Sequence, residues 1–210
     1  MDIVFEDNHI LLVNKIAGMP TQPNDTGVIS LQDQAKSWIK LMKKKPGDVF
    51  VHPIHRLDKG VSGLVLFAKT SKALSRLNAQ MREKTMRKIY YGIVEGEVTP
   101  KKGRLENFLK HGAYKALISS KEDREAKQAI LDYEVIKVEK AKSFVEISLL
   151  TGRYHQIRAQ FSFIGHPLWG DQKYGSSFHS EKICLHHGRF SFIHPVTKEF
   201  LTFEKAPSFF

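Results

Sequence analysis

Short apolar runs separated by polar turns dominate the first third of the chain. Residues 3–5 and 10–13 flank the polar segment 6–9, which predicts a β-hairpin. A loop rich in glycine and proline follows at residues 15–24. Residues 64–67, Leu-Val-Leu-Phe, form a continuous apolar run of the kind that a strand buried on both faces carries.

Two segments show helical periodicity. After Ser30, which can cap a helix, apolar side chains recur at a spacing near 3.6 residues, at Leu31, Ala35, Trp38, Ile39 and Met42. Ser71 is expected to cap a second helix through Leu74, Leu77 and Met81.

The second half alternates strands with charged turns, and one more helix is expected there. Residues 89–94 predict a strand, and the polar segment 101–127 predicts a twisted hairpin with an exposed tip at 119–125. Two further strands are expected at residues 130–137 and 143–150. A helix is expected at residues 153–164, with an apolar stripe of Tyr154, Ile157, Phe161 and Ile164. Two last strands are expected at residues 182–193 and 199–203.

Length and cysteine content limit the class of protein. A chain of 210 residues can bury a sizeable core as one large domain or two small ones, and we expect a single domain over residues 1–210. Because the chain has no apolar run of ~18 residues, no transmembrane helix is expected. The acidic N-terminus does not resemble a signal peptide. The single Cys184 excludes an internal disulfide, so a cytoplasmic protein is expected.

The charge balance points to a polyanionic partner. Lys and Arg number 33 against 22 Asp and Glu, which gives a net charge of +11 and a pI near 9.6. Nucleic acid is the better guess than an anionic membrane, although many basic proteins merely carry a basic face. The lysines at 43–45 are typical of a solvated helix end.

The segment 52–70 combines a charged loop with the buried run, and it carries His55, Arg56 and Asp58. Such a loop on a rigid scaffold is a common place for a functional group, with Asp58 as the candidate. The alternative, at least as strong on these residues alone, is that Asp58 caps a turn and pairs with Arg56.

Two further groups of residues could contact a nucleotide. The basic pair Arg87 and Lys88 precedes Tyr90 and Tyr91, which should point to opposite faces of a strand. One tyrosine could stack a base beside the basic pair, although core packing is the ordinary role of either. Arg158 borders the apolar face of the predicted helix 153–164, which indicates a partner carboxylate or a ligand phosphate.

Several common kinds of site are not indicated. The ten histidines show no zinc-site spacing, and no Gly-rich phosphate loop, dinucleotide fingerprint or Gly-x-Ser-x-Gly motif occurs. The sequence therefore implies neither a metal nor a cofactor.

Several motifs together resemble the RluA-type RNA pseudouridine synthases. The most specific are His-Arg-Leu-Asp at 55–58 and Thr-Gly-Arg-Tyr-His-Gln-Ile-Arg at 151–158. The similarity continues at residues 13–18, 62–70, 88–90, 165–175 and 185–195. It thus covers nearly the whole chain and begins within fifteen residues of Met1, so no S4-type RNA-binding domain is expected. Tyr154 and Trp169 stand where the family has smaller residues.

The resemblance implies a fold and an activity. The expected fold is α+β, a large, mostly antiparallel mixed sheet flanked by helices around a central catalytic cleft. The expected enzyme is an isomerase that converts uridines of structured RNA, rRNA or tRNA, to pseudouridine. It needs no cofactor or protein partner and is expected to be a monomer. Because a stacked, paired uridine cannot react, the nucleotide must be flipped out.

The resemblance also implies residue roles. Asp58 takes the place of the catalytic aspartate, as nucleophile or as base towards the sugar, and Arg158 that of its basic partner. A nearby guanidinium would keep a partly buried carboxylate ionised. Tyr90 matches the tyrosine that stacks on the target base, and Arg56 an arginine that holds the flipped nucleotide. The other expected substrate-binding residues are His55, Lys88, Arg153 and Gln156.

Two other functions compete with this interpretation. A non-catalytic RNA-binding module or RNA chaperone could keep the same fold and basic face. A glycoside hydrolase also breaks a glycosidic bond, but it usually needs two carboxylates. Asp171 is the only other acid in a dense motif, and its Gly-Asp loop indicates a structural role.

Overall fold

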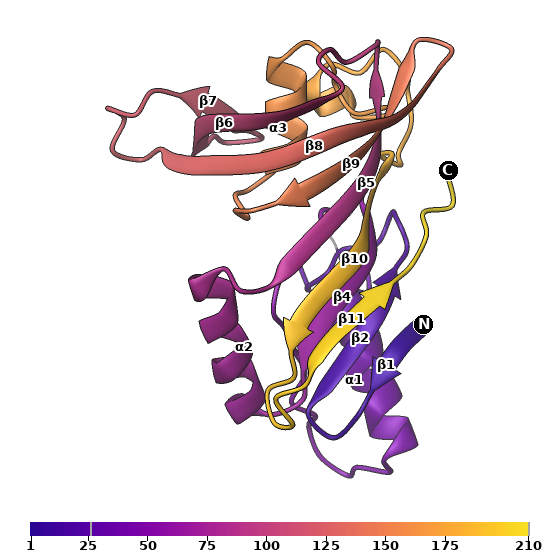
Figure 1. The fold of residues 1–210 in the computed structure, drawn as a ribbon. Helices are drawn as coiled ribbons and strands as arrows, with labels where there is room; N and C mark the ends of the chain where they lie inside the picture. Colours follow the sequence, from indigo (N-terminus) through magenta and orange to yellow (C-terminus); the bar gives the residue numbers. More distant parts are fainter. Residues whose placement is uncertain (26, 210) are drawn as a thin grey trace. The chain divides into compact units, whose positions relative to one another are not determined.

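The computed structural model describes residues 1–25 and 27–209, and these fall into two compact units (Figure 1). Unit 1 comprises Met1–Met86 and Gly188–Lys205. Unit 2 comprises Arg87–His187 and the C-terminal residues from Ala206 on. The secondary structure is a mixture of eleven strands with three α-helices in the described residues, so the expected α+β class is confirmed. The single domain over residues 1–210 stays a prediction.

Six neighbouring strands form the centre of unit 1. They are β1 (Asp2–Glu6), β2 (Ile10–Lys15), β3 (His52–Pro53), β4 (Ser62–Ala68) and β11 (Phe200–Glu204), together with β10 (Leu185–Ile193), which begins in unit 2. The order is β1-β2-β4-β10, with β3 beside β4 and β11 beside β10.

The β2–β4 pair confirms the prediction of a strand buried on both faces. Leu12 lies opposite Leu66, and Val13 lies opposite Val65. Since neighbouring residues of a strand face opposite sides and all four are 0% exposed, both faces of the pair are covered.

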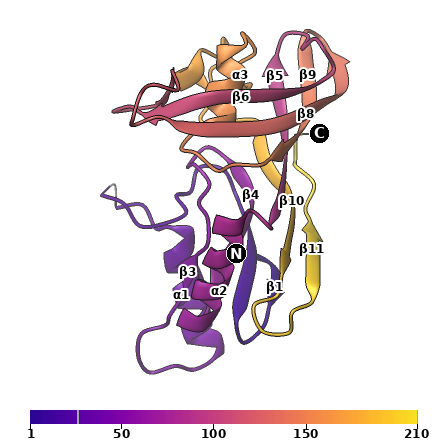
Figure 2. The same ribbon diagram turned by 60° about the vertical axis from the view of Figure 1, so that its left-hand side comes forward.

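Helix α1 (Leu31–Met42) has the bounds that its pattern predicts. Its start is fixed by a capping box, in which Asp33 N donates to Ser30 Oγ and Ser30 N donates to the Asp33 carboxylate. Helix α2 (Ser71–Glu83) begins where expected, but its cap is Thr70, whose hydroxyl accepts from Ala73 N, and not Ser71. Figure 2 shows both helices beside the strands of unit 1.

In the core of unit 1, helix α2 packs against strands from both ends of the sequence. Residues buried together in it come from β2, β4, α2 and β10: Ile10, Leu12, Leu64, Leu66, Ala73, Leu77, Phe190 and Phe192. Unit 1 is therefore built from two separate stretches of chain.

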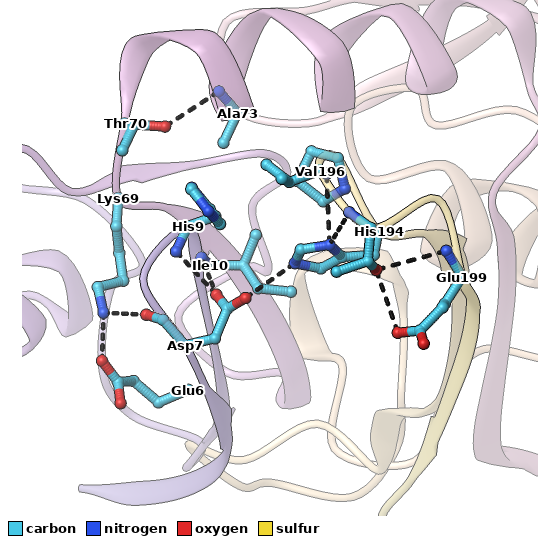
Figure 3. Close-up of polar contacts among 12 residues, drawn as sticks. Glu6, Asp7, His9, Ile10, Lys69, Thr70, Ala73, His194, Val196 and Glu199 are labelled. Carbon is cyan, nitrogen blue, oxygen red and sulfur yellow. Dashed lines mark hydrogen bonds and ion pairs between the residues drawn. The ribbon is translucent and has the colours of Figure 1, made fainter.

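A polar clasp joins the β1–β2 turn to the β10–β11 turn (Figure 3). Asp7 Oδ1 accepts from the backbone N–H groups of His9 and Ile10, at 2.8 and 2.7 Å. Its Oδ2 lies 2.9 Å from Nε2 of His194, a side chain that is 2% exposed. His194 Nδ1 accepts from Thr197 N at 2.9 Å. Burial raises the pKa of Asp7, but these hydrogen bonds outweigh it, so the pKa is lowered.

Five strands form the sheet of unit 2. They are β5 (Arg87–Glu95), β6 (Lys102–His111), β7 (Ala116–Ser119), β8 (Lys127–Glu139) and β9 (Lys142–Leu149), in the order β5-β9-β8-β6-β7 with antiparallel neighbours. The predicted turn between the last two is confirmed. Lys140 and Ala141 both have positive φ, at 50° and 57°, as a two-residue hairpin turn that follows the strand twist requires.

The prediction of one hairpin at residues 101–127 is wrong in its details. The turn lies at residues 112–115, where Gly112 N donates to Lys115 O, and residues 120–126 connect β7 to β8. The short strand β7 was missed because its polar neighbours obscure a pattern in which Ala116 is buried. Strand β6 therefore pairs on both edges, with β7 and with β8.

Helix α3 (Gln156–Phe163) begins three residues later than predicted. His155 adopts a left-handed conformation with φ 51°, which a helix interior cannot contain. Tyr154 consequently lies outside the helix and is 37% exposed, so its assignment to the apolar stripe is wrong. A short 3₁₀ turn, η1 (Gln172–Tyr174), follows.

Candidate functional site

The loop that carries Asp58 connects β3 to β4 in unit 1, and its backbone is fixed from several sides. Leu57 N donates to Thr21 Oγ1 at 3.0 Å, and the same hydroxyl donates to Leu57 O at 2.8 Å. Gly18 N donates to Lys59 O at 2.7 Å, and Val61 N donates to Asp58 O at 3.0 Å. The residues on either side of Asp58 are thus hydrogen-bonded to the loop after β2, and the carboxylate is half-buried on a rigid support.

Lys15, at the end of β2, places a buried cation beneath this loop. Its side chain is 1% exposed, and Nζ donates to the carbonyl oxygens of Met19 at 2.8 Å and Ile16 at 3.1 Å, with Lys59 O at 3.4 Å. Burial lowers the pKa of Lys15 to about 8, while the nearby Asp58 carboxylate acts in the opposite direction. Lys15 therefore ties the loop after β2 to the residue that follows Asp58.

The other two expected residues of this loop differ in exposure. His55 is half-buried; its Nε2 lies 3.4 Å from Leu66 N, and its ring meets Phe190 edge-on at 5.0 Å. Arg56 is exposed. The first residue is suited to fixing the loop against β4, and the second to meeting a ligand.

In unit 2, Arg158 forms a buried ion pair with Asp171. Arg158 Nε lies 2.7 Å from one carboxylate oxygen and an NH2 nitrogen 2.8 Å from the other, so the pair is bidentate. The two side chains are 7% and 1% exposed. The carboxylate expected beside Arg158 is therefore present, and the structural role expected for Asp171 is confirmed. The ion pair gives each of these buried side chains a hydrogen-bonded partner of opposite sign.

Tyr174 lies against this pair. The guanidinium carbon of Arg158 lies 4.9 Å from the centre of the Tyr174 ring. Burial raises the pKa of Tyr174 well above its usual value, so the phenol stays protonated. Arg158 is thus held by a carboxylate at its edge and an aromatic ring at its face.

Strand β5 supplies Lys88 and Tyr90. Tyr90 is 6% exposed and stacks on His187 at 4.5 Å, whereas Tyr91 on the other face is half-buried. Lys88 is 9% exposed, and burial lowers its pKa. A Cβ built on Gly152 would lie 3.7 Å from Lys88 Nζ, so the lysine reaches the Thr-Gly-Arg segment.

Gln156 is a buried hydrogen-bonding centre at the start of α3. Its oxygen accepts from Thr151 Oγ1 at 2.7 Å and from Arg153 N at 3.1 Å, and its nitrogen donates to Ile130 O at 3.1 Å. These contacts favour a role in positioning the Thr-Gly-Arg turn. Arg153 is exposed, with Nε donating to Gln128 O at 2.9 Å.

The predicted residues thus form two groups. His55, Arg56 and Asp58 share one loop of unit 1, while Lys88, Tyr90, Arg153, Gln156 and Arg158 belong to unit 2. The pairing of Asp58 with Arg158 stays a prediction, as do the catalytic and substrate-binding roles. Sequence reasoning missed the part played by Lys15, whose signal is a lysine two residues after the apolar run 10–13, Ile-Leu-Leu-Val.

Residues 1–25 and 27–209 contain neither a candidate metal site nor a candidate membrane span. No group of three histidine, cysteine or acidic side chains there could hold a metal ion. Likewise, no helix in that part of the chain has the length and apolar character to cross a membrane.

Residues 9–163 match the model of the RNA pseudouridylate synthase family. The chain is 33% identical over 221 residues to the dual-specificity RNA pseudouridine synthase RluA of Pasteurella multocida, an alignment that covers 100% of this chain and 94% of that protein. It is 31% identical to tRNA pseudouridine synthase C of Haemophilus influenzae, covering 96% and 91% of the two chains.

A further relative is an uncharacterized RNA pseudouridine synthase, YhcT, of Bacillus subtilis, which is 34% identical over 97% of this chain and 68% of its own length. The chain therefore belongs to the RNA pseudouridylate synthase family, and it is an RNA pseudouridine synthase, an isomerase.

Solved structures agree on the fold. The human RNA pseudouridylate synthase domain containing 4 superposes with a TM-score of 0.83 at 20% identity, covering 99% of this chain and 89% of the other. The human domain containing 1 gives 0.78 at 22% identity, covering 100% and 84%. The expected pseudouridine synthase fold is thereby confirmed.

Proposed function

We propose that this enzyme isomerises uridines of structured RNA, in rRNA or tRNA, with Asp58 as its catalytic carboxylate. The relatives' names support the substrate class, since they include a dual-specificity enzyme, a tRNA enzyme and a ribosomal large subunit enzyme. The observation that carries the role of Asp58 is its place in a His-Arg-Leu-Asp loop whose backbone is fixed on both sides of the carboxylate.

The reaction changes which base atom bonds to the sugar. The bond from N1 to C1′ breaks, the uracil rotates, and C5 bonds to C1′. C5 loses its proton and N1 gains one, so no atoms or electrons are gained or lost overall. Asp58 acts either as the nucleophile on the sugar carbon or as the base that removes a sugar proton.

The remaining residues hold the nucleotide. Tyr90 stacks on the target base, Arg56 binds the flipped-out nucleotide, and Arg158 acts as the basic partner of Asp58. Their support is the family match together with the separate geometry of each group: an exposed Arg56, a ring stacked on His187 for Tyr90, and a guanidinium locked by Asp171 for Arg158.

The test is a pseudouridine map of RNA from a strain that lacks the protein. Wild type should restore the modification. Asp58→Ala should form pseudouridine at an initial rate that is about 100-fold or more below that of wild type. The matched control is Asp48→Ala, which removes an exposed acid of the same unit and should behave as wild type. Restoration of the modification by Asp58→Ala would overturn the assignment. A chaperone would instead leave the map unchanged when the wild type is absent.

Affinity for RNA should fall steeply with salt. The net charge of +11 implies phosphate contacts, which release counterions on binding. The measurement is the dissociation constant for an RNA stem-loop between 50 and 200 mM salt, with the logarithm of the constant plotted against the logarithm of the salt concentration. Salt-independent binding would contradict a phosphate-tracking surface.

A further inference from the structure

Four aromatic rings of unit 2 lie one beside the next and form a ladder: His111, Tyr154, His155 and Tyr174. The His111 and Tyr154 rings are stacked at 4.2 Å and 22°, and those of Tyr154 and His155 at 3.8 Å and 21°. His155 then meets Tyr174 edge-on at 5.6 Å. The ladder brings together the end of β6, the segment before α3, and η1.

The two imidazoles cover opposite faces of Tyr154. Two near-parallel rings cannot both fit within about 4 Å of one face, because each needs the usual van der Waals spacing from the other. Tyr154 is therefore sandwiched and exposes its edge, at 37% exposure, whereas His111 is exposed at the outer end. Among the described residues, the outer face of His111 meets no other aromatic ring.

The inner end of the ladder is rigid. Tyr174 is 6% exposed; its hydroxyl accepts from Ala116 N at 2.7 Å and lies 3.0 Å from His155 Nδ1. His155 itself is held at φ 51°, an unfavourable conformation that persists only where the surroundings fix it. Through Tyr174 the ladder reaches Arg158, which the proposed function places beside the target uridine.

Exposed groups close to the ladder favour RNA. Tyr114, at the β6–β7 turn, is 80% exposed. The exposed cations Lys115 and Arg153 flank the ladder: Lys115 Nζ lies 5.7 Å from the Tyr174 ring, and Arg153 directly precedes Tyr154. Aromatic faces beside cations are how single-stranded nucleic acids are bound, since bases stack while phosphates meet the charges.

The other departure from the family pattern, Trp169, lacks such an opening. Lys142 Nζ lies 3.7 Å from its ring centre, and Phe178 stacks on it at 4.6 Å. The nearby Glu95 carboxylate, which accepts from Ser177 N, would also repel a phosphate. Of the two unusual aromatic residues, Tyr154 is thus the one placed to affect RNA recognition.

We propose that the outer face of His111, backed by Tyr154 and His155, stacks an unpaired base of the RNA that flanks the target uridine, while Lys115 and Arg153 contact its phosphates. This inference rests on the proposed function and deepens it, because the target is the uridine that the enzyme would isomerise with Asp58. It makes Tyr154 a specificity-determining residue, because the ladder selects RNA in which a base near the target uridine is unstacked.

The experiment measures binding and does not use product formation. The probe is a nine-nucleotide RNA backbone that is abasic except for one central 2-aminopurine, and the reference probe is abasic throughout. Stacking should quench the 2-aminopurine fluorescence on binding to wild type. His111→Ala and Tyr154→Leu should each weaken binding of the first probe about tenfold and leave binding of the reference probe unchanged.

Two controls separate stacking from a general loss of structure. His111→Phe keeps a flat ring and should retain the affinity within about threefold. Phe163→Leu removes an aromatic residue of α3 that is 61% exposed and has no place in the ladder, and it should bind as wild type. Thermal melting of each variant checks that unit 2 is folded.

The proposal would be overturned if His111→Ala and Tyr154→Leu both bound the 2-aminopurine probe with wild-type affinity. It would also be overturned if these variants lost as much affinity for the fully abasic probe. Neither result bears on Asp58, whose test is the appearance of pseudouridine. Conversely, a catalytically intact Asp58→Ala would refute the proposed catalytic role and leave the stacking measurement standing.

Discussion

The two units anchor their candidate residues with different kinds of buried cation. In unit 1, Lys15 Nζ donates to neutral acceptors, the backbone carbonyls of Ile16, Met19 and Lys59, and the Asp58 carboxylate acts on it only from nearby. In unit 2, Arg158 has a full bidentate carboxylate from Asp171. The first arrangement leaves a cation that can lose its proton near neutral pH, and the second keeps its charge throughout the accessible range.

Removing the charge of Asp171 should cost the most. Asp171→Asn leaves the Arg158 guanidinium buried without its counter-charge, so the free energy of unfolding should fall by about 3–5 kcal/mol. Chemical denaturation measures this loss.

The matched control is Asp132→Asn, which breaks the exposed bidentate pair of Arg104 with Asp132. Because exposed ion pairs contribute little, this variant should be far less destabilised. Equal losses from the two substitutions would mean that burial does not decide the strength of these pairs, and the contrast between the units would fail.

Lys15→Met should have the next largest effect. The substitution removes the donor to three part-buried hydrogen bonds with backbone carbonyls, which costs about 1–3 kcal/mol at pH 7. It also removes a titration. Since the pKa of Lys15 is about 8 in the folded chain and 10.5 unfolded, the unfolded state binds more protons between these values, and wild-type stability rises with pH there. The measurement is the difference in unfolding free energy between wild type and variant from pH 7 to 11.

That difference should widen in favour of wild type by up to about 3 kcal/mol above pH 8, because other titrating groups cancel between the two proteins. Lys59→Met, at an exposed lysine of the same loop, serves as the control for the loss of a lysine from this loop. A constant difference for Lys15→Met would show that Lys15 titrates normally.

Breaking the clasp of Asp7 with His194 should give the smallest effect. Asp7→Asn should lower the free energy of unfolding by about 1 kcal/mol at pH 7. The pKa of Asp7 is lowered in the folded state, so its contribution is present above the ordinary value of 3.8 and is lost as the pH falls through the lowered value. Thermal melting at pH 7 and pH 3 checks this; a loss that is larger at pH 3 would contradict it.

The sequence predicts elements well where local signals agree. Helix α1 has its bounds because Ser30, Asp33 and the apolar spacing all indicate the same start and face. Strand β4 follows from an unbroken apolar run. Helix α3 begins late because the left-handed His155 is held by contacts with Tyr174 and Tyr154, which are set by tertiary structure.

In the candidate site, too, local motifs could be predicted from the sequence and tertiary contacts could not. Asp58 and Arg158 stand out because motifs carry them, and Gly170-Asp171 already indicated a structural acid. The partners of Lys15 could not be predicted, since they are backbone carbonyls of a loop with no regular pattern. The aromatic ladder was equally hidden, because its rings come from three segments far apart in the sequence.

The path of the chain gives unit 2 the character of an insertion. Unit 1 closes only when Gly188–Lys205 returns, because Phe190 and Phe192 of β10 complete a core begun by Ile10 and Leu12. During synthesis, the first segment therefore lacks the β10 partner of β4 until about a hundred more residues have left the ribosome, and only the short β3 covers part of that edge. Truncation at residue 86 would leave an aggregation-prone fragment, whereas a circular permutant that joins the two ends of unit 1 would place its whole core in one continuous stretch.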